Sequence, residues 1–356
     1  MKQAELIGKA QTVLGVIDAD SLGVTLYHEH LLLDMAPWFV EPSEASERGL
    51  AHQPVTLENL HWVRVNRFSN VDNLQLTDEQ VAIKEALLYK WAGGDTIVEV
   101  SSIGLSRDPL GLARIARATG LNLIMGSGYY IGASHPPELA TKTEKEITEE
   151  IVRDIMVGVG DTGVRAGVIG EIGCSLPLEE GERKVLRASA AAQRRTGAAT
   201  IVHPSPDDDL ALEIIKILSD ADADLSRTII SHVDLWGYSL TTRRKLMDAG
   251  CYIGYDNFGH LGYPHLLQGR LVELKGDLER VYDVIQLISE GYLNQILIAQ
   301  DHCFKDCLTT YGGYGYAHML RNVVRIMRIK GVTDEQIHTL LVDNPKRVFQ
   351  FVPAKD

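Results

Sequence analysis

Two histidines close to the start of the chain have the spacing of a metal-binding pair. His28 and His30 flank Glu29, and residues two apart in an extended strand point to the same face, so both imidazoles can contact one cation. Imidazole and carboxylate groups are the expected protein ligands of Zn²⁺, Mn²⁺, Co²⁺ and Fe²⁺. An HxH pair alone also arises by chance or as structural histidines. It predicts a metal site only together with further ligands.

Four further ligand-type residues stand at the carboxyl ends of short apolar runs. These residues are Glu171, His203, His232 and Asp301. The carboxyl ends of barrel strands open on one face, where the active sites of such folds lie, so all six groups are expected to meet there. The set predicts a centre of two divalent cations. Zinc is the first expectation, and Mn²⁺, Co²⁺ or Fe²⁺ are the alternatives.

A two-cation centre gives each ligand an expected role. Two cations about 3.5–4 Å apart need an anion between them, and Glu171 is the candidate bridge. The more buried cation is assigned His28, His30 and Asp301, and the more exposed one His203 and His232. A water that bridges two cations is acidified, which makes hydroxide available at neutral pH. Asp301 is the predicted catalytic base that takes its proton, and the alternative for Asp301 is an internal salt bridge.

Elements that could position these groups are visible as eight short apolar runs rich in β-branched residues. They span 24–28, 96–100, 122–126, 166–171, 199–203, 228–232, 251–256 and 296–301. Continuous rather than alternating apolar character is typical of parallel strands that are covered on both sides. Segments of helical periodicity lie between them, such as 278–290. The alternation predicts an α/β fold, and eight strands favour a (β/α)8 TIM barrel over an open sheet.

Two segments fall outside the eight repeating units. Residues 1–20 predict a short N-terminal strand lead-in, and residues 36–76 form a long insertion after the first strand. A long loop after a barrel strand lies on the catalytic face, so this insertion is expected to be a lid or a pocket wall. No repeat, linker or low-complexity stretch divides the chain. Residues 1–356 are therefore interpreted as a single metal-dependent hydrolase barrel domain.

The overall charge and the apolar pattern limit the partners of this chain. The formal net charge is −13, whereas nucleic acids and anionic membranes require a basic surface. The first residues lack the apolar segment of a signal peptide, and no apolar run approaches the roughly 20 residues that span a bilayer. We expect a cytoplasmic protein that acts on a small molecule and binds neither nucleic acid nor membrane.

Aromatic and basic residues near the predicted catalytic face are candidates for substrate contacts. They are Trp38, Tyr129, Tyr130, Tyr255 and Lys305. Aromatic side chains commonly form pocket walls, although a packing or loop role is the alternative for each of them. Lys305 would suit a substrate carboxylate or sulfonate, and its alternative is a solvated surface lysine.

These motifs resemble the phosphotriesterase branch of the amidohydrolase superfamily, and within it the phosphotriesterase-related group. The resemblance extends over nearly the whole chain and is carried by residues 11–15, 25–31, 170–175, 202–204, 231–232, 301, 311–316 and 344–345. It implies a barrel with a binuclear metal centre, and family members are often homodimers. Organophosphate-degrading members bridge their metals with a carboxylated lysine, whereas this sequence has Glu171 at the matching position.

The resemblance implies hydrolysis of an ester, lactone, amide or phosphoester bond without choosing among them. The leading interpretation is a hydrolase of a lactone, carboxylic ester or amide, with phosphotriesters as side substrates. One alternative makes phosphotriester hydrolysis the main activity, which the glutamate bridge weakens. The other is a non-catalytic small-molecule-binding protein on the same barrel, in which the loss of at least one ligand is expected. No ligand is lost in this sequence.

Overall fold

Eight parallel strands form the centre of the computed structural model, which describes residues 2–260, 265–267, 270–272 and 274–355. The strands are β3 (Thr25–Glu29), β6 (Thr96–Glu99), β7 (Asn122–Ser127), β8 (Val168–Gly173), β9 (Thr200–His203), β10 (Thr228–Ile230), β11 (Tyr252–Tyr255) and β14 (Ile296–Ile298). They are paired in chain order from β3 to β14. The amide of Asp301 donates to the carbonyl of His28 at 3.2 Å and so joins the two end strands. The predicted TIM barrel is confirmed.

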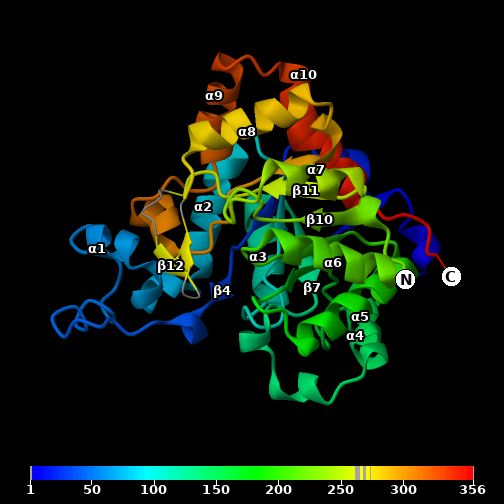
Figure 1. Ribbon diagram of the computed structural model, residues 1–356, viewed down its shortest axis with the longest axis horizontal. Coiled ribbons are helices and arrows are strands. Elements are labelled where there is room, and N and C mark those ends of the chain that lie inside the picture. The colour runs from blue at the N-terminus through cyan, green and yellow to red at the C-terminus, as the bar shows by residue number, and fades with distance from the viewer. Residues whose placement is uncertain (1, 261–264, 268–269, 273, 356) are drawn as a thin grey trace.

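Helices surround these strands (Figure 1). Those between strands are α2 (Glu79–Trp91), α3 (Pro109–Thr119), α4 (Glu144–Met156), α5 (Glu180–Thr196), α6 (Asp208–Asp220), α7 (Leu240–Asp248) and α8 (Asp277–Ser289). The chain ends with α9 (Val324–Ile329), α10 (Asp334–His338) and α11 (Asn344–Phe349), with π-helical turns at Met319–Val323 and Thr339–Asp343. The Asp78 carboxylate caps α2 by accepting from the amides of Gln80 and Val81 at 2.8 and 3.2 Å. Such caps satisfy amides that have no partner in the first turn.

The apolar core has two layers. Inside the barrel, side chains such as Tyr27, Val98 and Ile201 form one cluster, which Val348 and Phe349 of α11 close at one end. A larger cluster lies between the outer faces of the strands and the helices. Successive residues of a strand point to opposite faces, so each strand supplies both layers. Both faces of the sheet are therefore buried, as continuous apolar runs predict.

The insertion at 36–76 is anchored at both ends. β4 (Leu33–Asp34) and β5 (Gln75–Leu76) form a short antiparallel pair that closes its base. Between them lie α1 (Leu60–Val65) and three short 3₁₀ turns. In Figure 1, α1 lies at the left, far from the two termini at the right. The insertion therefore builds one end of the molecule.

The N-terminal lead-in folds as predicted. β1 (Lys9–Thr12) and β2 (Gly15–Asp18) form an antiparallel hairpin. The amide of Gly8 and the carbonyl of Lys9 both bond to Phe351, at 2.9 and 2.8 Å, which joins the start of the chain to its end. A third antiparallel pair consists of β12 (His265–Leu267) and β13 (Arg270–Val272).

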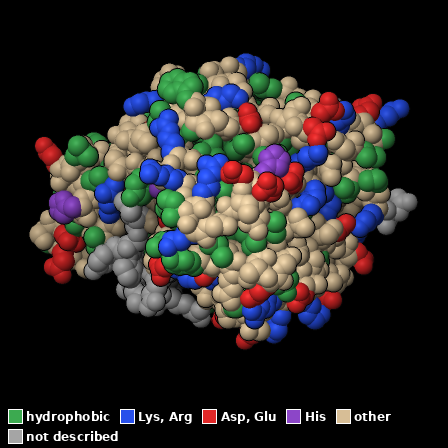
Figure 2. All heavy atoms as spheres, turned by 90° about the horizontal axis from the view of Figure 1, so that it is seen from above, with side chains coloured by type: hydrophobic (Ala, Val, Ile, Leu, Met, Phe, Trp, Pro, Cys, Tyr) green, Lys and Arg blue, Asp and Glu red, His purple; other side chains and the backbone are tan. Residues whose placement is uncertain are grey.

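Acidic and basic side chains are interspersed on the face that Figure 2 shows. Ion pairs such as Arg187 with Glu144 at 2.6 Å and Arg195 with Glu149 at 2.7 Å join neighbouring helices. Of the helices in the described parts of the chain, none has the length and apolar character that a membrane crossing needs.

Candidate metal centre

All six predicted ligands meet at the carboxyl end of the barrel, around the carboxylate of Glu171 on β8. Its Oε1 lies 3.4 Å from His30 Nε2. Its Oε2 lies 3.5 Å from His28 Nε2 and 3.5 Å from His232 Nε2, and 3.0 Å from His203 Nδ1. Asp301 Oδ1 lies 3.2 Å from His30 Nε2 and 3.8 Å from His28 Nε2. Glu171 thus bridges the two pairs of histidines.

Hydrogen bonds to Nδ1 orient three of the imidazoles. His28 Nδ1 lies 3.1 Å from Ser231 Oγ, and His30 Nδ1 lies 2.9 Å from Ser101 Oγ. His232 Nδ1 lies 2.8 Å from the Asp256 carboxylate. Outer partners of this kind fix the ring orientation of metal-ligating histidines. In each case the other nitrogen, Nε2, is the one that faces Glu171.

The donor set fits divalent cations. Nε2 of His28 and Nε2 of His232 are buried and have no hydrogen-bond partner among the described residues, although buried polar atoms are normally satisfied. Two groups of potential ligands have atoms within 4.8 Å of one another: His28 with His30 and Asp301, and His28 with Glu171 and His232. The first group is the one expected for the more buried cation.

The charges of these groups are those that a cation site requires. Burial raises the pKa of Glu171, but the charge of His28 and a hydrogen bond with His203 lower it well below its usual value. Burial lowers the pKa of His30, yet Asp301 and Glu171 raise it to about 10. A concentration of negative charge that holds a proton so firmly also attracts a divalent cation.

Two of the predicted ligands, His232 and Asp301, lie just beyond their strands on left-handed backbone. The sixth and eighth runs were predicted to continue to His232 and Asp301, whereas β10 ends at Ile230 and β14 at Ile298. The φ angles are 58° at His232 and 48° at Asp301. This conformation is uncommon for residues other than glycine and ends the strand ladder. Such strained positions gather at functional sites.

A cavity of about 870 Å³, its open mouth included, lies over Glu171, His203 and Asp301. Its other lining residues are mostly apolar, among them Leu33, Phe68, Leu105, Ile131, Trp236 and Phe304. Two predicted substrate contacts line it, Trp38 and Tyr130, whose ring centroids are 5.8 Å apart. The hydroxyl of Tyr130 is also 3.4 Å from His203.

The structure does not bring the other three predicted contacts, Tyr129, Tyr255 and Lys305, to this cavity. The Tyr129 hydroxyl donates to Glu150 of α4 at 2.5 Å. Tyr255 points outward into the helix layer, where its hydroxyl accepts from Arg243 at 2.7 Å. Each of the two tyrosines is adjacent in sequence to a residue that faces the barrel interior: Tyr129 to Tyr130, and Tyr255 to Asp256. Successive residues of an extended segment point to opposite sides, so the two tyrosines face outward. Lys305 pairs with Asp72 at 2.5 Å and packs over the Tyr311 ring.

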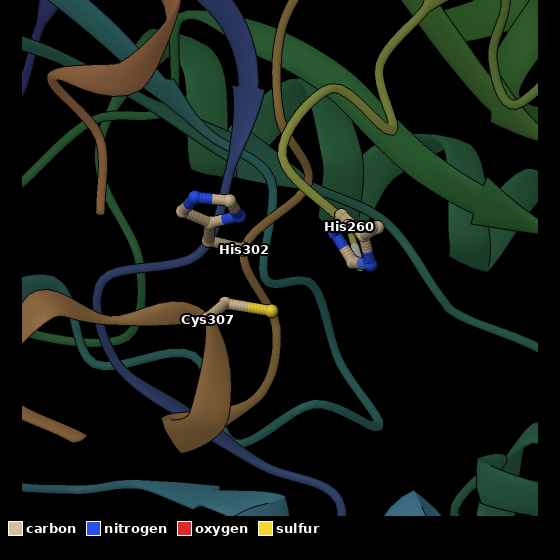
Figure 3. A group of neighbouring side chains, drawn as sticks. All are labelled: His260, His302 and Cys307. Carbon is tan, nitrogen blue, oxygen red and sulfur yellow. The ribbon is translucent and has the colours of Figure 1, made fainter. Parts of the chain in front are cut away.

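A third group of potential ligands, shown in Figure 3, does not fit a cation. It consists of His260, from the loop after β11, with His302 and Cys307, from the segment after β14. Both ring nitrogens of His260 already have partners: Nδ1 lies 3.0 Å from Arg67 Nη1, and Nε2 donates to the carbonyl of Asp301 at 2.9 Å. The adjacent guanidinium also repels a cation.

Comparison with known proteins agrees with this geometry. The profile of the Phosphotriesterase family matches residues 8–349. The chain belongs to the Phosphotriesterase family. It is 41% identical to the N-acetyltaurine hydrolase of Danio rerio and 38% identical to that of Dictyostelium discoideum, each over 98% of this chain and 99% of the relative. The crystal structure of a resiniferatoxin-binding protein from Rhodobacter sphaeroides superposes with a TM-score of 0.93 at 35% identity and covers 96% of this chain and 95% of that one.

The chain is therefore a hydrolase of the Phosphotriesterase family. Sequence reasoning assigned no functional role to several further site residues. Asp256 ends the seventh predicted run, so the strand-end rule that found Glu171 could have found it. Ser101 and Ser231 stand next to strand ends, where only contact with a histidine distinguishes them from ordinary loop serines.

The most important missed residue is Arg67, in the 3₁₀ turn Arg67–Ser69 of the insertion. It lines the cavity, and its side chain is only 5% exposed. Burial lowers the pKa of Arg67, but the charge of Asp306 raises it above its ordinary value, so the guanidinium stays charged. No periodic pattern in the irregular segment 36–76 marks this position.

Proposed function

We propose that this chain is a metal-dependent amide hydrolase that cleaves a small N-acyl compound, with N-acetyltaurine and longer N-acyl taurines as the first candidates. The observation that carries the proposal is the Glu171 carboxylate held among four imidazoles beside Asp301. The names of the relatives that are 38% and 41% identical over their whole length support an amide as the scissile bond. We propose zinc as the metal.

The metal ligands would be His28, His30, Glu171, His203, His232 and Asp301. When bound, the cations would acidify water and polarise the carbonyl oxygen of the substrate. The chain's own task is to fix these groups and exclude solvent. Ser231, Ser101 and Asp256 hold three of the imidazoles from behind. The apolar walls of the cavity keep bulk water from the reacting groups.

Asp301 is the proposed proton carrier. Its backbone is fixed on both sides, because its amide donates to the His28 carbonyl at 3.2 Å and its carbonyl accepts from His260 Nε2 at 2.9 Å. Its carboxylate receives the proton that water loses as the water oxygen attacks the carbonyl carbon. When the C–N bond breaks, the same carboxylate gives that proton to the leaving nitrogen. An amine leaves poorly without a proton, so this second transfer is essential for an amide.

The lining of the cavity supports acyl groups larger than acetyl. The cavity is open to solvent at its mouth, and its wall includes the apolar side chains of Trp38, Phe68 and Trp236. These side chains can pack against an extended acyl chain. Each additional buried methylene contributes about 0.8 kcal/mol.

The test is a hydrolysis screen of protein loaded separately with Zn²⁺, Mn²⁺ or Co²⁺. The substrates are N-acetyltaurine, N-hexanoyltaurine, a γ-lactone, an aryl ester and a phosphotriester. The proposal expects the two amides to give the highest kcat/KM. A tenfold higher kcat/KM for the lactone, ester or phosphotriester would replace the amide with that substrate class. Binding of the panel without turnover of any member would identify a binding protein.

A further inference from the structure

Arg67 places a positive charge in a cavity wall that is mostly apolar and contains the carboxylates of Glu171 and Asp301. It is the sole lysine or arginine among the described residues that line this cavity. Its Nε and Nη2 donate to Asp306 Oδ2 at 3.2 and 3.0 Å, and its Nη1 lies 3.0 Å from His260 Nδ1. The ring of Phe304 packs against the guanidinium at 5.3 Å. The side chain is thus held rigidly in one orientation.

The partners of Arg67 use only some of its donors. Asp306 is buried and does not belong to the cavity lining, whereas Arg67 and His260 do. A guanidinium has five N–H hydrogens, and the three hydrogen bonds use three of them. The other two have no acceptor among the described residues. A rigid guanidinium with two free donors has the geometry that binds a carboxylate or a sulfonate.

We infer that Arg67 binds an anionic group on the amine half of the substrate, a sulfonate or a carboxylate. This inference rests on the proposed amide hydrolysis at the same site. His260 links the two centres, because one of its ring nitrogens contacts Arg67 and the other bonds the Asp301 carbonyl. The anion site is therefore one imidazole ring away from the backbone of the proposed proton carrier. We expect a short N-acyl amino acid or amino sulfonate to reach both centres.

Lys305, the cation that the sequence suggested for this role, does not compete with Arg67. Its ammonium group pairs with Asp72 and does not line the cavity. Lys305→Ala is therefore a matched control that removes a neighbouring positive charge without touching the proposed anion site.

The first experiment compares charged and neutral substrates with the same scissile bond. N-acetyltaurine is paired with its neutral sulfone counterpart, N-acetyl-2-(methylsulfonyl)ethylamine, and with N-acetyl-β-alanine as the carboxylate. Arg67→Gln is expected to lower kcat/KM for the two anions by about 10- to 100-fold, mostly through KM, because charged hydrogen bonds are lost. The sulfone should change by less than threefold, and Lys305→Ala should leave all three substrates unchanged.

Removal of Arg67 alone leaves the Asp306 carboxylate buried without a counterion, which could unfold the protein. The double variant Arg67→Gln/Asp306→Asn removes both charges and keeps the hydrogen-bonding shape. It should show the same selective loss for anions. Arg67→Lys, which keeps the charge without the fork of donors, should recover part of the lost affinity.

The second experiment measures binding without hydrolysis, by calorimetry. The probes are pentane-1-sulfonate, hexanoate and the neutral methyl pentyl sulfone. If Arg67→Gln weakens the affinity for the sulfonate or for hexanoate at least tenfold, the anion site is supported even if no amide is cleaved. The anion that binds more tightly to the wild-type protein identifies the preferred group. Equal effects of Arg67→Gln on anionic and neutral substrates, with amide turnover intact, would overturn the anion site and leave the hydrolase in place.

Discussion

Asp301 has two separable roles, metal ligand and proton carrier, and a single substitution distinguishes them. Asp301→Asn keeps an oxygen that can ligate weakly but removes the ability to accept a proton. We expect kcat for the amide to fall by roughly 100- to 10,000-fold, the value of positioned proton transfer, while KM changes by only a few-fold. The measurement is steady-state kinetics at matched metal content.

The rival base is His302, whose pKa is lowered by burial to about 3. A surviving kcat in Asp301→Asn, together with a large loss in His302→Gln, would exchange the two assignments.

Glu171 is expected to hold both cations through its two oxygens. In Glu171→Ala the imidazoles would face two cations with no anion between them, so occupancy should fall from two metals to one or fewer. Elemental analysis after equilibration with metal measures this. Glu150→Ala, which removes a carboxylate outside the cavity, should retain both metals. Because glutamate is anionic without carboxylation, added bicarbonate should leave wild-type activity unchanged. A strong bicarbonate requirement would contradict the bridge.

At the scale of elements, regular strands were predictable and the irregular insertion was not. The eight runs and their ends located six ligand-type residues, since a buried parallel strand has a simple apolar signature and its carboxyl end has a fixed side of the barrel. The side to which a single residue turns just after a strand was less predictable. Tyr129 and Tyr130 are adjacent in sequence, yet only Tyr130 lines the cavity. Arg67 depends on contacts with Asp306 and His260, more than 190 residues away in the chain, which no local pattern encodes.

The insertion is expected to set the length of the acyl group. Trp38 is half-buried, lines the cavity and packs against Tyr130. Trp38→Ala should remove apolar contacts with a long acyl chain but leave the metal ligands in place. We expect kcat/KM for N-hexanoyltaurine to fall about tenfold, equivalent to the loss of one to two buried methylene contacts, with less than a threefold change for N-acetyltaurine. Trp91→Ala is the control, because Trp91 is 70% exposed on α2. Equal losses for both substrates would remove Trp38 from the acyl site.

For the whole molecule, the candidate metal centre connects the two ends of the barrel sequence. His28 lies in the first barrel strand and Asp301 follows the last, and the hydrogen bond between their backbones joins those strands. Cations held by both residues would therefore oppose the separation of β3 from β14. Anything that binds the folded state alone stabilises it, by about 2.7 kcal/mol for each site when the free ion is at 100 times its Kd.

Removal of the metal should consequently lower the thermal stability of the whole barrel and not only its activity. Unfolding entropy scales with chain length, so for 356 residues each kcal/mol corresponds to roughly 1–2 °C in Tm. With both sites filled, treatment with a chelator should lower Tm by roughly 5–10 °C at a fixed scan rate, and restored Zn²⁺ should recover it. Glu171→Ala should show a smaller response to the chelator, because it has already lost metal. An unchanged Tm in a wild-type protein shown to have lost both ions would mean that the six ligands are prearranged by the barrel. The outer contacts of Ser101, Ser231 and Asp256 would then suffice to hold the site.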